Sequence, residues 1–242
     1  NKAWKNLDFT IITPSSWLQK SASSSSLFEN RPIKVIPPGI NTKIYRPINK
    51  KIARELLFLP QNRQLILFGA LAATSDRRKG FHLLQSSLQE LSQSEWRDKL
   101  KLVIFGASKP DNPPDFGFPV RYLGTLSDKL SLAMVYSAAD VFVLPSVQDN
   151  LPNTALESLA CGTPCVAFNI GGIPDLVKHQ QNGYLAQHFE VKDLIRGIVW
   201  VLENQERHQK LSHCAREKIE QEFTLEISAS RYLSLYETIL TK

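Results

Sequence analysis

The sequence predicts an α/β protein with a doubly wound, Rossmann-like parallel sheet of about six strands, helices on both faces and a helical C-terminal tail. Three observations support this fold class. Short runs that are apolar on both faces recur along the chain, which is typical of strands buried in a parallel sheet. Amphipathic stretches of helical length separate these runs. After Ala186 the spacing is almost entirely helical.

The strand-like runs follow one another at intervals that leave room for a helix or a loop. They are KVIP (34–37), QLILFGA (64–70), KLVIFGA (101–107), VRYLG (120–124), DVFVLPS (140–146), PCVAF (164–168) and GYLA (183–186). Helical spacing is found in residues 80–91 and 126–139, and Ser127 or Asp128 can cap the second helix. In the tail, Tyr232, Leu235, Tyr236 and Ile239 form one apolar helical face. We expect this face to be covered by other parts of the protein.

Residues 1–38 differ from this pattern. They contain one strand-like run, DFTIITPS (8–15), then a serine-rich stretch that we expect to be a loop, SASSSS (21–26), and the start of a Pro-Pro-Gly hinge. Because a lone strand has no sheet of its own, residues 1–38 are interpreted as the remnant of a preceding domain plus a linker, or as a ragged N-terminus. Residues 39–242 would form the Rossmann-like domain.

Composition narrows the function classes. The formal charge of +6 favours anionic partners, such as phosphorylated ligands or an anionic membrane face, without choosing between them. No run approaches the roughly 18 to 20 apolar residues of a membrane-spanning helix, and residues 1–9 lack an apolar signal segment, so we expect a cytoplasmic protein. Cys161, Cys165 and Cys214 are odd in number and lack metal-ligand spacing, which argues against a disulfide framework or a metal site.

The stretch DNLPNTALESLACGTPCVAF (149–168) follows a buried strand directly. In a doubly wound sheet, ligands bind beyond the carboxyl ends of the strands, where we expect Asp149 and Asn150. Pro152 suits the first turn of a helix, whose free N–H groups would point into the cleft and form an anion site. We expect these N–H groups to belong to Asn153, Thr154 and Ala155.

Glu157 lies about one turn further along the same helix. Two carboxylates, Asp149 and Glu157, therefore flank a helix start that can bind phosphate. Acceptor groups on both sides of a phosphate site suit the hydroxyl groups of a ribose and of a sugar joined by pyrophosphate. The pattern predicts a site for a nucleotide diphosphate sugar.

The same stretch, continued to residue 177, resembles the donor-site signature of the retaining group 1 glycosyltransferases, also called glycosyltransferase family 4. The family pattern is an acidic residue, seven others and Glu, then a helix of small residues, Cys-Gly-Thr-Pro, a strand and Gly-Gly. Weaker similarity covers nearly the whole chain, in TPSSWL, IPPGINTKIYRP, RRKGFHLL, YLGTLSD and FTLE. The resemblance implies one half of the two-domain GT-B fold.

What the family does with these positions can be carried over. In the family, the second acidic residue of the motif holds the ribose hydroxyls, and Glu157 has that position here. The first acidic residue contacts the transferred sugar, and Asp149 has that position. Most family members have Glu at the first position, so the shorter Asp149 leaves the identity of the sugar open. The sugar and phosphates would be lined largely by backbone groups of Asn150, Leu151, Pro152, Asn153 and Thr154.

The cluster SDRRKGF (75–81) resembles the family's diphosphate-binding basic pair. Lys79 matches the family's lysine. The family's arginine would fall at Ala70 and is missing, so Arg77 or Arg78 is a candidate substitute. Fixed positive groups can meet the charge that develops on a leaving diphosphate without a metal. A solvated surface turn is the alternative interpretation.

Two further segments resemble family features. In the family, the segment between the strand that VRYLG resembles and the next helix lies beside the nucleobase. Tyr122, Leu123 and Gly124 match that segment and are candidates for contact with the base, although Leu123 is equally suited to the core. Gly171 and Gly172 resemble the loop near the donor, and the alternative is a helix-entry turn that needs positive φ.

The resemblance implies transfer of a sugar from a nucleotide diphosphate sugar to an acceptor hydroxyl with retention of configuration. The donor is expected to be a UDP- or GDP-sugar, and the acceptor a glycan, lipid or small molecule. Catalysis would rest on Asp149, Glu157 and Lys79, with neither metal nor cofactor beyond the donor. The acceptor would bind through an N-terminal domain that this chain mostly lacks, so the chain alone is expected to bind nucleotide and transfer little.

Several other interpretations stay open or are disfavoured. No Cys–His or Ser–His–Asp grouping indicates a protein nucleophile, and a glycosidase-like carboxylate pair would leave the phosphate features without a use. The chain could belong to another GT-B enzyme, such as a nucleotide-sugar epimerase, or be a non-catalytic nucleotide-sugar-binding module. Peripheral association with the inner face of a membrane and a dimer of this chain are open, and nucleic acid is not an expected partner.

Overall fold

The computed structural model describes residues 7–69 and 76–241, and its main feature is a six-stranded parallel sheet. The strands are β3 (Gln64–Gly69), β4 (Leu100–Phe105), β5 (Val120–Tyr122), β6 (Val141–Leu144), β7 (Cys165–Phe168) and β8 (Gly183–Ala186). Their order across the sheet is β5-β4-β3-β6-β7-β8, and each neighbouring pair is parallel. The chain moves outward from β3 in one direction and from β6 in the other. This is the doubly wound topology that the sequence predicts.

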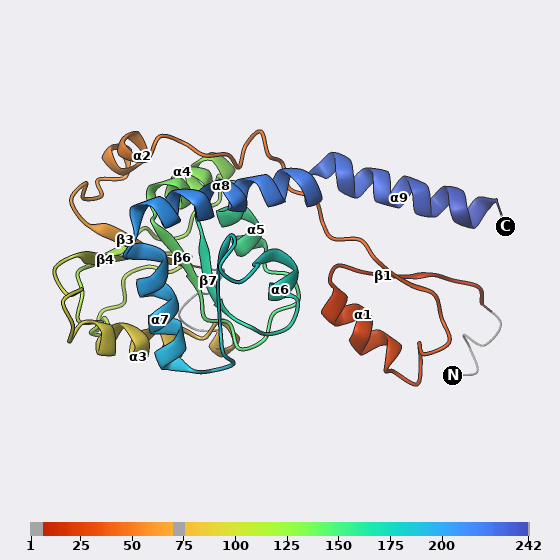
Figure 1. Cartoon of the computed structure of the whole chain (residues 1–242), viewed down its shortest axis with the longest axis horizontal. Coiled ribbons are helices and arrows are strands. Elements are labelled where there is room, and N and C mark those ends of the chain that lie inside the picture. Colours follow the sequence, from red (N-terminus) through yellow and green to blue (C-terminus); the bar gives the residue numbers. More distant parts are fainter. Residues whose placement is uncertain (1–6, 70–75, 242) are drawn as a thin grey trace.

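Helices cover both faces of the sheet (Figure 1). Helices α3 (Phe81–Leu91) and α7 (Val191–Leu202) pack together on one face. The opposite face is covered by α4 (Lys129–Ala138) and α5 (Asn153–Ala160), with α2 (Lys50–Leu56) against α4 and α8 (Gln205–Glu222) against α5. Short helices precede α3 and follow β7, namely the 3-10 turn η1 (Arg77–Lys79) and α6 (Ile173–Leu176). The predicted cap of α4 is Asp128, which accepts from the N–H of Ser131 at 2.7 Å.

The central strands are buried on both sides because their side chains meet helices on both faces. Each residue of β6 and β7 is buried, and so is each residue of β3 after Gln64. Continuous apolar sequence is what such strands need, since a polar side chain on either face would lose its hydration without gaining a partner. The apolar runs therefore predict the sheet correctly.

A buried ionic cluster closes the amino end of the sheet. Asp140, immediately before β6, accepts from Lys50 at 2.8 Å, from the Arg54 guanidinium and from the N–H of Leu65 at 2.6 Å. Burial alone would raise the pKa of Asp140, but the charges of Lys50 and Arg54 outweigh it and lower that pKa. The cluster joins α2 to two adjacent strands.

Residues 7–36 form a separate small unit in which β1 (Ile11–Thr13) pairs in parallel with β2 (Ile33–Val35), connected by α1 (Ser16–Ser23). Figure 1 shows this unit apart from the main sheet. The expectation that the first strand lacks a partner is wrong, because KVIP pairs with it and does not join the six-stranded sheet.

The serine-rich stretch is also partly helical, since α1 continues to Ser23. Its hydroxyls donate to carbonyls one turn back, from Ser21 to Trp17 at 3.0 Å and from Ser23 to Gln19 at 2.9 Å. These bonds satisfy the side chains within the helix, which composition alone does not reveal.

The tail ends in α9 (Leu225–Leu240), which extends beyond the main body (Figure 1). The expectation of a covered apolar face on α9 holds for Leu235, which is 9% exposed. It is wrong for Tyr236 and Ile239, which are 52% and 45% exposed, because the helix passes the end of the sheet.

Two other predictions concern the cysteines and membrane insertion. Cys161 and Cys165 are buried, Cys214 is half-buried, and all three are free. Burial raises the pKa of the Cys161 thiol to about 12. Across residues 7–69 and 76–241, no helix has both the length and the apolar character that crossing a membrane requires.

Candidate functional site

The candidate site lies where the strand order reverses, between β3 and β6. At such a switch point the two chains leave the sheet in opposite directions and open a crevice at the carboxyl ends of the strands. The segment after β3 leads to Lys79, and the segment after β6 leads to Asp149. Ala70, where the resemblance places a missing arginine, lies outside the described residues.

The turns after β3 and β6 are joined by an ion pair. The Nζ atom of Lys79 lies 2.9 Å from Oδ2 of Asp149, and the two side chains are 26% and 14% exposed. The Ser146 hydroxyl lies 3.5 Å from the same carboxylate oxygen. The sequence-predicted cation and the first carboxylate therefore meet at the switch point.

Close backbone packing holds this pair in place. Gly80 has a φ of +69°, and a Cβ atom there would lie 1.8 Å from the carbonyl oxygen of Pro145. The N–H of Val147 donates to the carbonyl of Arg78 at 2.8 Å. Only glycine permits both this conformation and this approach, which fixes the Lys79 turn against the chain leaving β6.

The two arginines of the cluster are arranged differently from Lys79. Arg78 pairs with Asp76 at 2.9 Å, and its side chain is 71% exposed. The hydrogen bonds from Arg78 lower the pKa of Asp76. Arg77 and Arg78 line a cavity of about 520 Å³ together with His82, Leu83, Val147 and Phe189. Both arginines thus stay beside the Lys79 turn without contacting Asp149 in this structure.

The second carboxylate, Glu157, faces a different direction. It lies on α5, where its Oε2 accepts from the Tyr136 hydroxyl of α4 at 2.8 Å. Burial raises the pKa of Glu157, and the hydroxyls of Tyr136 and Tyr45 oppose that rise. Burial together with the Glu157 charge raises the pKa of Tyr136 and of Tyr45.

Sequence reasoning missed Tyr136 and Tyr45. Tyr136 lies 0% exposed in α4, in a helical pattern that reads as ordinary core, and Tyr45 lies in the segment before α2. The usable signal was the polar hydroxyl at a core position of a helix, which needs a partner when buried.

The start of α5 differs slightly from the prediction. Pro152 precedes the helix as its N-cap residue, and the helix begins at Asn153. The N–H of Ala155 donates to the carbonyl of Pro152 at 3.1 Å, so the expectation that it is free is wrong. Asn153 is exposed, Thr154 is half-buried, and Leu151 packs partly against the core.

The glycine pair packs against the loop that carries the first carboxylate. Gly171 has a φ of +52°, and a Cβ atom there would lie 1.9 Å from the carbonyl oxygen of Asp149. A Cβ atom at Gly172 would lie 1.7 Å from the carbonyl oxygen of Asn150, and the N–H of Gly172 donates to Asp149 at 3.2 Å. The two loops predicted to share the site are therefore in contact.

The candidates for nucleobase contact lie at the carboxyl end of the edge strand β5. The Tyr122 hydroxyl is buried and has no hydrogen-bond partner in the described part of the chain, and burial raises its pKa. Leu123 packs partly against the core, as its alternative interpretation states. Gly124 has a φ of +70°, with open space where a Cβ would point. These residues are two strands away from β3.

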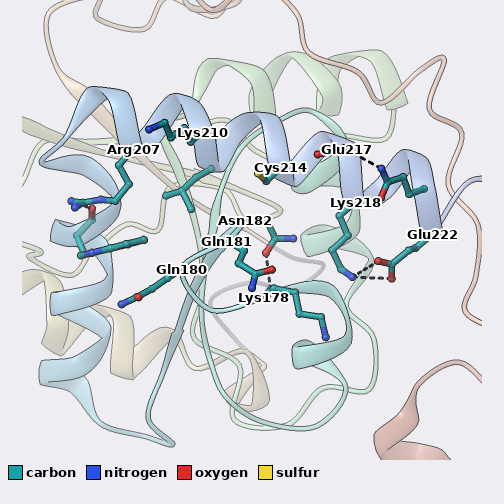
Figure 2. A pocket seen from close by; sticks show the side chains of 13 residues that line it. Lys178, Gln180, Gln181, Asn182, Arg207, Lys210, Cys214, Glu217, Lys218 and Glu222 are labelled. Carbon is teal, nitrogen blue, oxygen red and sulfur yellow. Dashed lines mark hydrogen bonds and ion pairs between the residues drawn. The ribbon is translucent and has the colours of Figure 1, made fainter.

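A cavity of about 730 Å³ lies elsewhere, between the turn before β8 and helices α7 and α8 (Figure 2). Its rim includes Lys178, Arg207, Lys210 and Lys218, and Figure 2 shows Lys218 paired with Glu222 one turn further along α8. The cavity is at the amino end of β8, opposite the edge at which doubly wound sheets bind ligands. Among the described residues, no cluster of three or more His, Cys, Asp or Glu side chains could hold a metal ion.

Comparisons with known proteins agree with the fold. The family model for glycosyl transferases group 1 matches residues 62–204. The D-inositol 3-phosphate glycosyltransferase of Segniliparus rotundus is 30% identical over 161 residues, which are 63% of this chain and 35% of that protein. Sucrose-phosphate synthase from Thermosynechococcus elongatus superposes with a TM-score of 0.80 at 26% identity, covering 96% of this chain and 58% of that one.

A third comparison adds a bound ligand. An Anabaena protein solved in complex with UDP-glucose superposes with a TM-score of 0.78 at 18% identity, covering 98% of this chain and 66% of that one. The chain spans about half or less of the length of the curated relatives it matches.

Proposed function

The chain belongs to the group 1 glycosyl transferases, and from that membership we propose that it binds the nucleotide diphosphate sugar from which the full enzyme transfers a sugar to an acceptor hydroxyl. The observation that carries the proposal is the Lys79–Asp149 pair at the switch point. A cation, a carboxylate and the start of α5 converge there, which suits a diphosphate with a sugar attached.

Each part of the donor has a chemically matched partner. Lys79 supplies a positive charge for the diphosphate, and the N–H groups at the start of α5 add the positive end of a helix dipole. Glu157 is a half-buried acceptor for the ribose hydroxyls, and its carboxylate is already oriented by Tyr136. Asp149, Asn150 and the glycine pair adjoin the position of the transferred sugar.

The same residues can assist bond cleavage. As the bond between the sugar and the diphosphate breaks, negative charge grows on the leaving diphosphate, and Lys79 is placed to stabilise it. Arg77 or Arg78 can reach the same charge from the neighbouring cavity if its side chain reorients. We propose that this transfer retains the configuration of the sugar and needs no metal, with Asp149 binding the sugar and not attacking it.

The acceptor side of the reaction is proposed from the length of the relatives. Since this chain spans only about half or less of their length, we propose that binding of a glycan or lipid acceptor needs additional polypeptide. The isolated chain would bind donor and transfer little. Its charge of +6 would suit a cytoplasmic enzyme held peripherally at an anionic membrane face.

Calorimetric titration with UDP, GDP and ADP in the presence of EDTA tests the proposal. The Anabaena complex makes UDP the first probe. One of the three diphosphates should bind. Glu157→Ala should lower the affinity for it about tenfold or more, which corresponds to roughly 1.4 kcal/mol of binding free energy. Glu95→Ala, on an exposed ion pair with Lys99, is the control. The proposal fails if no diphosphate binds the wild type, or if Glu157→Ala binds as tightly as wild type.

A non-catalytic binding module and a nucleotide-sugar epimerase would give the same titration. They are separated by assays of a longer enzyme that includes this chain. Sugar transfer with release of nucleotide diphosphate supports the transferase, sugar-ring isomerisation supports the epimerase, and binding without either reaction supports the module.

A further inference from the structure

The small N-terminal unit is hydrogen-bonded directly to the loops of the candidate site. The Ser15 hydroxyl donates to Oδ1 of Asn150. The backbone N–H and the hydroxyl of Ser16 donate to the two carboxylate oxygens of Asp175, at 2.7 Å and 2.6 Å. These bonds connect segments more than a hundred residues apart in the sequence, so they are tertiary contacts and not local turns.

The local structure explains why these side chains meet. Ser15 is the N-cap of α1, and its hydroxyl also accepts from the N–H of Leu18 at 3.2 Å. Asp175 lies in the first turn of α6, and its carboxylate points at the first N–H of α1. A carboxylate at the N-terminus of α1 is favoured by the dipole of that helix.

The contact is tightly packed as well as hydrogen-bonded. Ser15 is 0% exposed. A Cβ atom at Gly172 would lie 2.6 Å from the Cβ of Ser15 and 1.7 Å from the carbonyl oxygen of Asn150. Three segments therefore meet at Gly172, namely the start of α1, the loop after β6 and the loop after β7.

This junction is continuous with the ion pair of the site. The N–H of Gly172 donates to the carbonyl of Asp149, and the side chain of Asp149 accepts from Lys79. A displacement of α1 would thus pull on the same loop that orients the first carboxylate. We call Ser15, Ser16, Asn150 and Asp175 the serine latch.

We propose that the serine latch positions the Asp149–Asn150 loop for the sugar part of the donor, with Ser15, Ser16 and Asp175 as positioning residues. This inference rests on the proposed function. The nucleoside end of the donor would be held by Glu157 on α5, which the latch does not touch. Breaking the latch should weaken recognition of the sugar more than recognition of the nucleotide.

Hydrogen exchange of the free protein tests the latch without any ligand. Ser16→Ala removes one of its bonds and Asp175→Asn removes its charge. Both should speed amide exchange in residues 149–150 and at Gly172 by roughly three- to tenfold, the loss expected for one net hydrogen bond. Ser21→Ala, on the same helix but bonded only to Trp17 by the contacts described, should leave these amides unchanged.

Titration with UDP and with UDP-glucose tests the consequence for binding. In Ser16→Ala and Asp175→Asn, the affinity for UDP-glucose should fall roughly three- to tenfold while the affinity for UDP stays at the wild-type value. A Gly172→Ala variant, which wedges the three segments apart, should show the same selective loss. A general loss of stability would lower both affinities together.

The outcomes separate the latch from the proposed function. If the wild type binds none of UDP, GDP and ADP, the proposed function is wrong, and the exchange experiment alone decides the latch. Unchanged exchange in both latch variants overturns the proposal. So does an equal loss of UDP and UDP-glucose affinity, because that result shows a purely structural contact.

Discussion

Lys79 donates from Nζ to Oδ2 of Asp149 across 2.9 Å, which joins the two chains that leave the sheet at its switch point. In the absence of a donor, the Asp149 carboxylate is therefore paired with Lys79, the cation that the proposed function assigns to the diphosphate. A diphosphate must compete with Asp149 for Lys79.

This competition predicts opposite effects of two substitutions. Lys79→Ala should weaken UDP binding by about tenfold or more, since a charge-assisted hydrogen bond is lost. Asp149→Asn should strengthen UDP binding a few-fold, because it frees Lys79, while it weakens any preference for UDP-glucose over UDP. Calorimetry on both variants measures this, with Lys99→Ala at an exposed ion pair as the control. Weaker UDP binding by Asp149→Asn would contradict the competition.

The half-buried Glu157 predicts a pH-dependent gain of stability on substitution. Burial raises the pKa of Glu157, so its ionisation costs folding free energy that grows as the pH rises above the ordinary glutamate pKa and is complete above the raised one. Well below the ordinary pKa of glutamate, about 4.3, the side chain is neutral in both states and the cost is absent. Glu157→Gln should therefore raise Tm at pH 7 by a few degrees and leave Tm near pH 3 almost unchanged.

Differential scanning calorimetry at the two pH values measures the Glu157→Gln effect. The same variant should bind nucleotide more weakly than wild type, which is the usual cost of stabilising a functional site. A lower Tm at pH 7 would mean that the hydrogen bond from Tyr136 outweighs the burial of the charge.

Two glycines with similar backbone angles predict unequal costs. Gly80 and Gly124 have φ values of +69° and +70°, but a Cβ at Gly80 would meet Pro145 at 1.8 Å while that at Gly124 meets open space. Gly124→Ala should cost only the strain of a left-handed residue, roughly 1–2 kcal/mol. Gly80→Ala should cost more and also displace Lys79. Urea unfolding and UDP titration of both variants test this, and equal stability losses would show that the turn yields without strain.

The ionic cluster at Asp140 predicts a large stability loss. Asp140→Ala leaves Arg54, whose side chain is 6% exposed, without its carboxylate, and should cost about 3–5 kcal/mol in urea unfolding. Because the native pKa of Asp140 is lowered, its contribution is present above the ordinary aspartate pKa and is lost as the pH falls through the lowered value. Glu95→Ala, at an exposed pair, should leave the unfolding midpoint unchanged.

The sheet and the place of Asp149 at its carboxyl edge could be predicted from sequence because each rests on a local pattern, whereas the ion pair of Asp149 with Lys79 was not predicted. Apolar runs such as those around Phe142 indicate strands buried on both faces, and the carboxyl-end rule then places Asp149 beside the segment after β3. The partner of Glu157 could not be predicted in this way. Tyr136 is on another helix, and which helix faces meet depends on packing, which periodicity does not specify.

The N-terminal unit was the other limit of sequence reasoning. Residues 33–35 resemble the strands of the main sheet in composition, and their pairing with β1 depends on the path of the connecting helix. The bonds from Ser16 to Asp175 likewise join segments that no local pattern relates. Serine-rich composition also hid α1, since hydrogen bonds to backbone carbonyls one turn back are visible only in the folded chain.

The strand order has a consequence for how the chain reaches its native state. Each pairing in the six-stranded sheet is parallel, and β3 takes both β4 and β6 as neighbours, with Ile66 opposite Val141. Parallel strands cannot be joined by a tight hairpin, so a long connection must lose conformational entropy before the two strands form their contacts. Folding is therefore expected on the millisecond-to-second scale, with apolar strand edges exposed meanwhile. Slow synthesis at low temperature and refolding at high dilution should favour the native protein over aggregates.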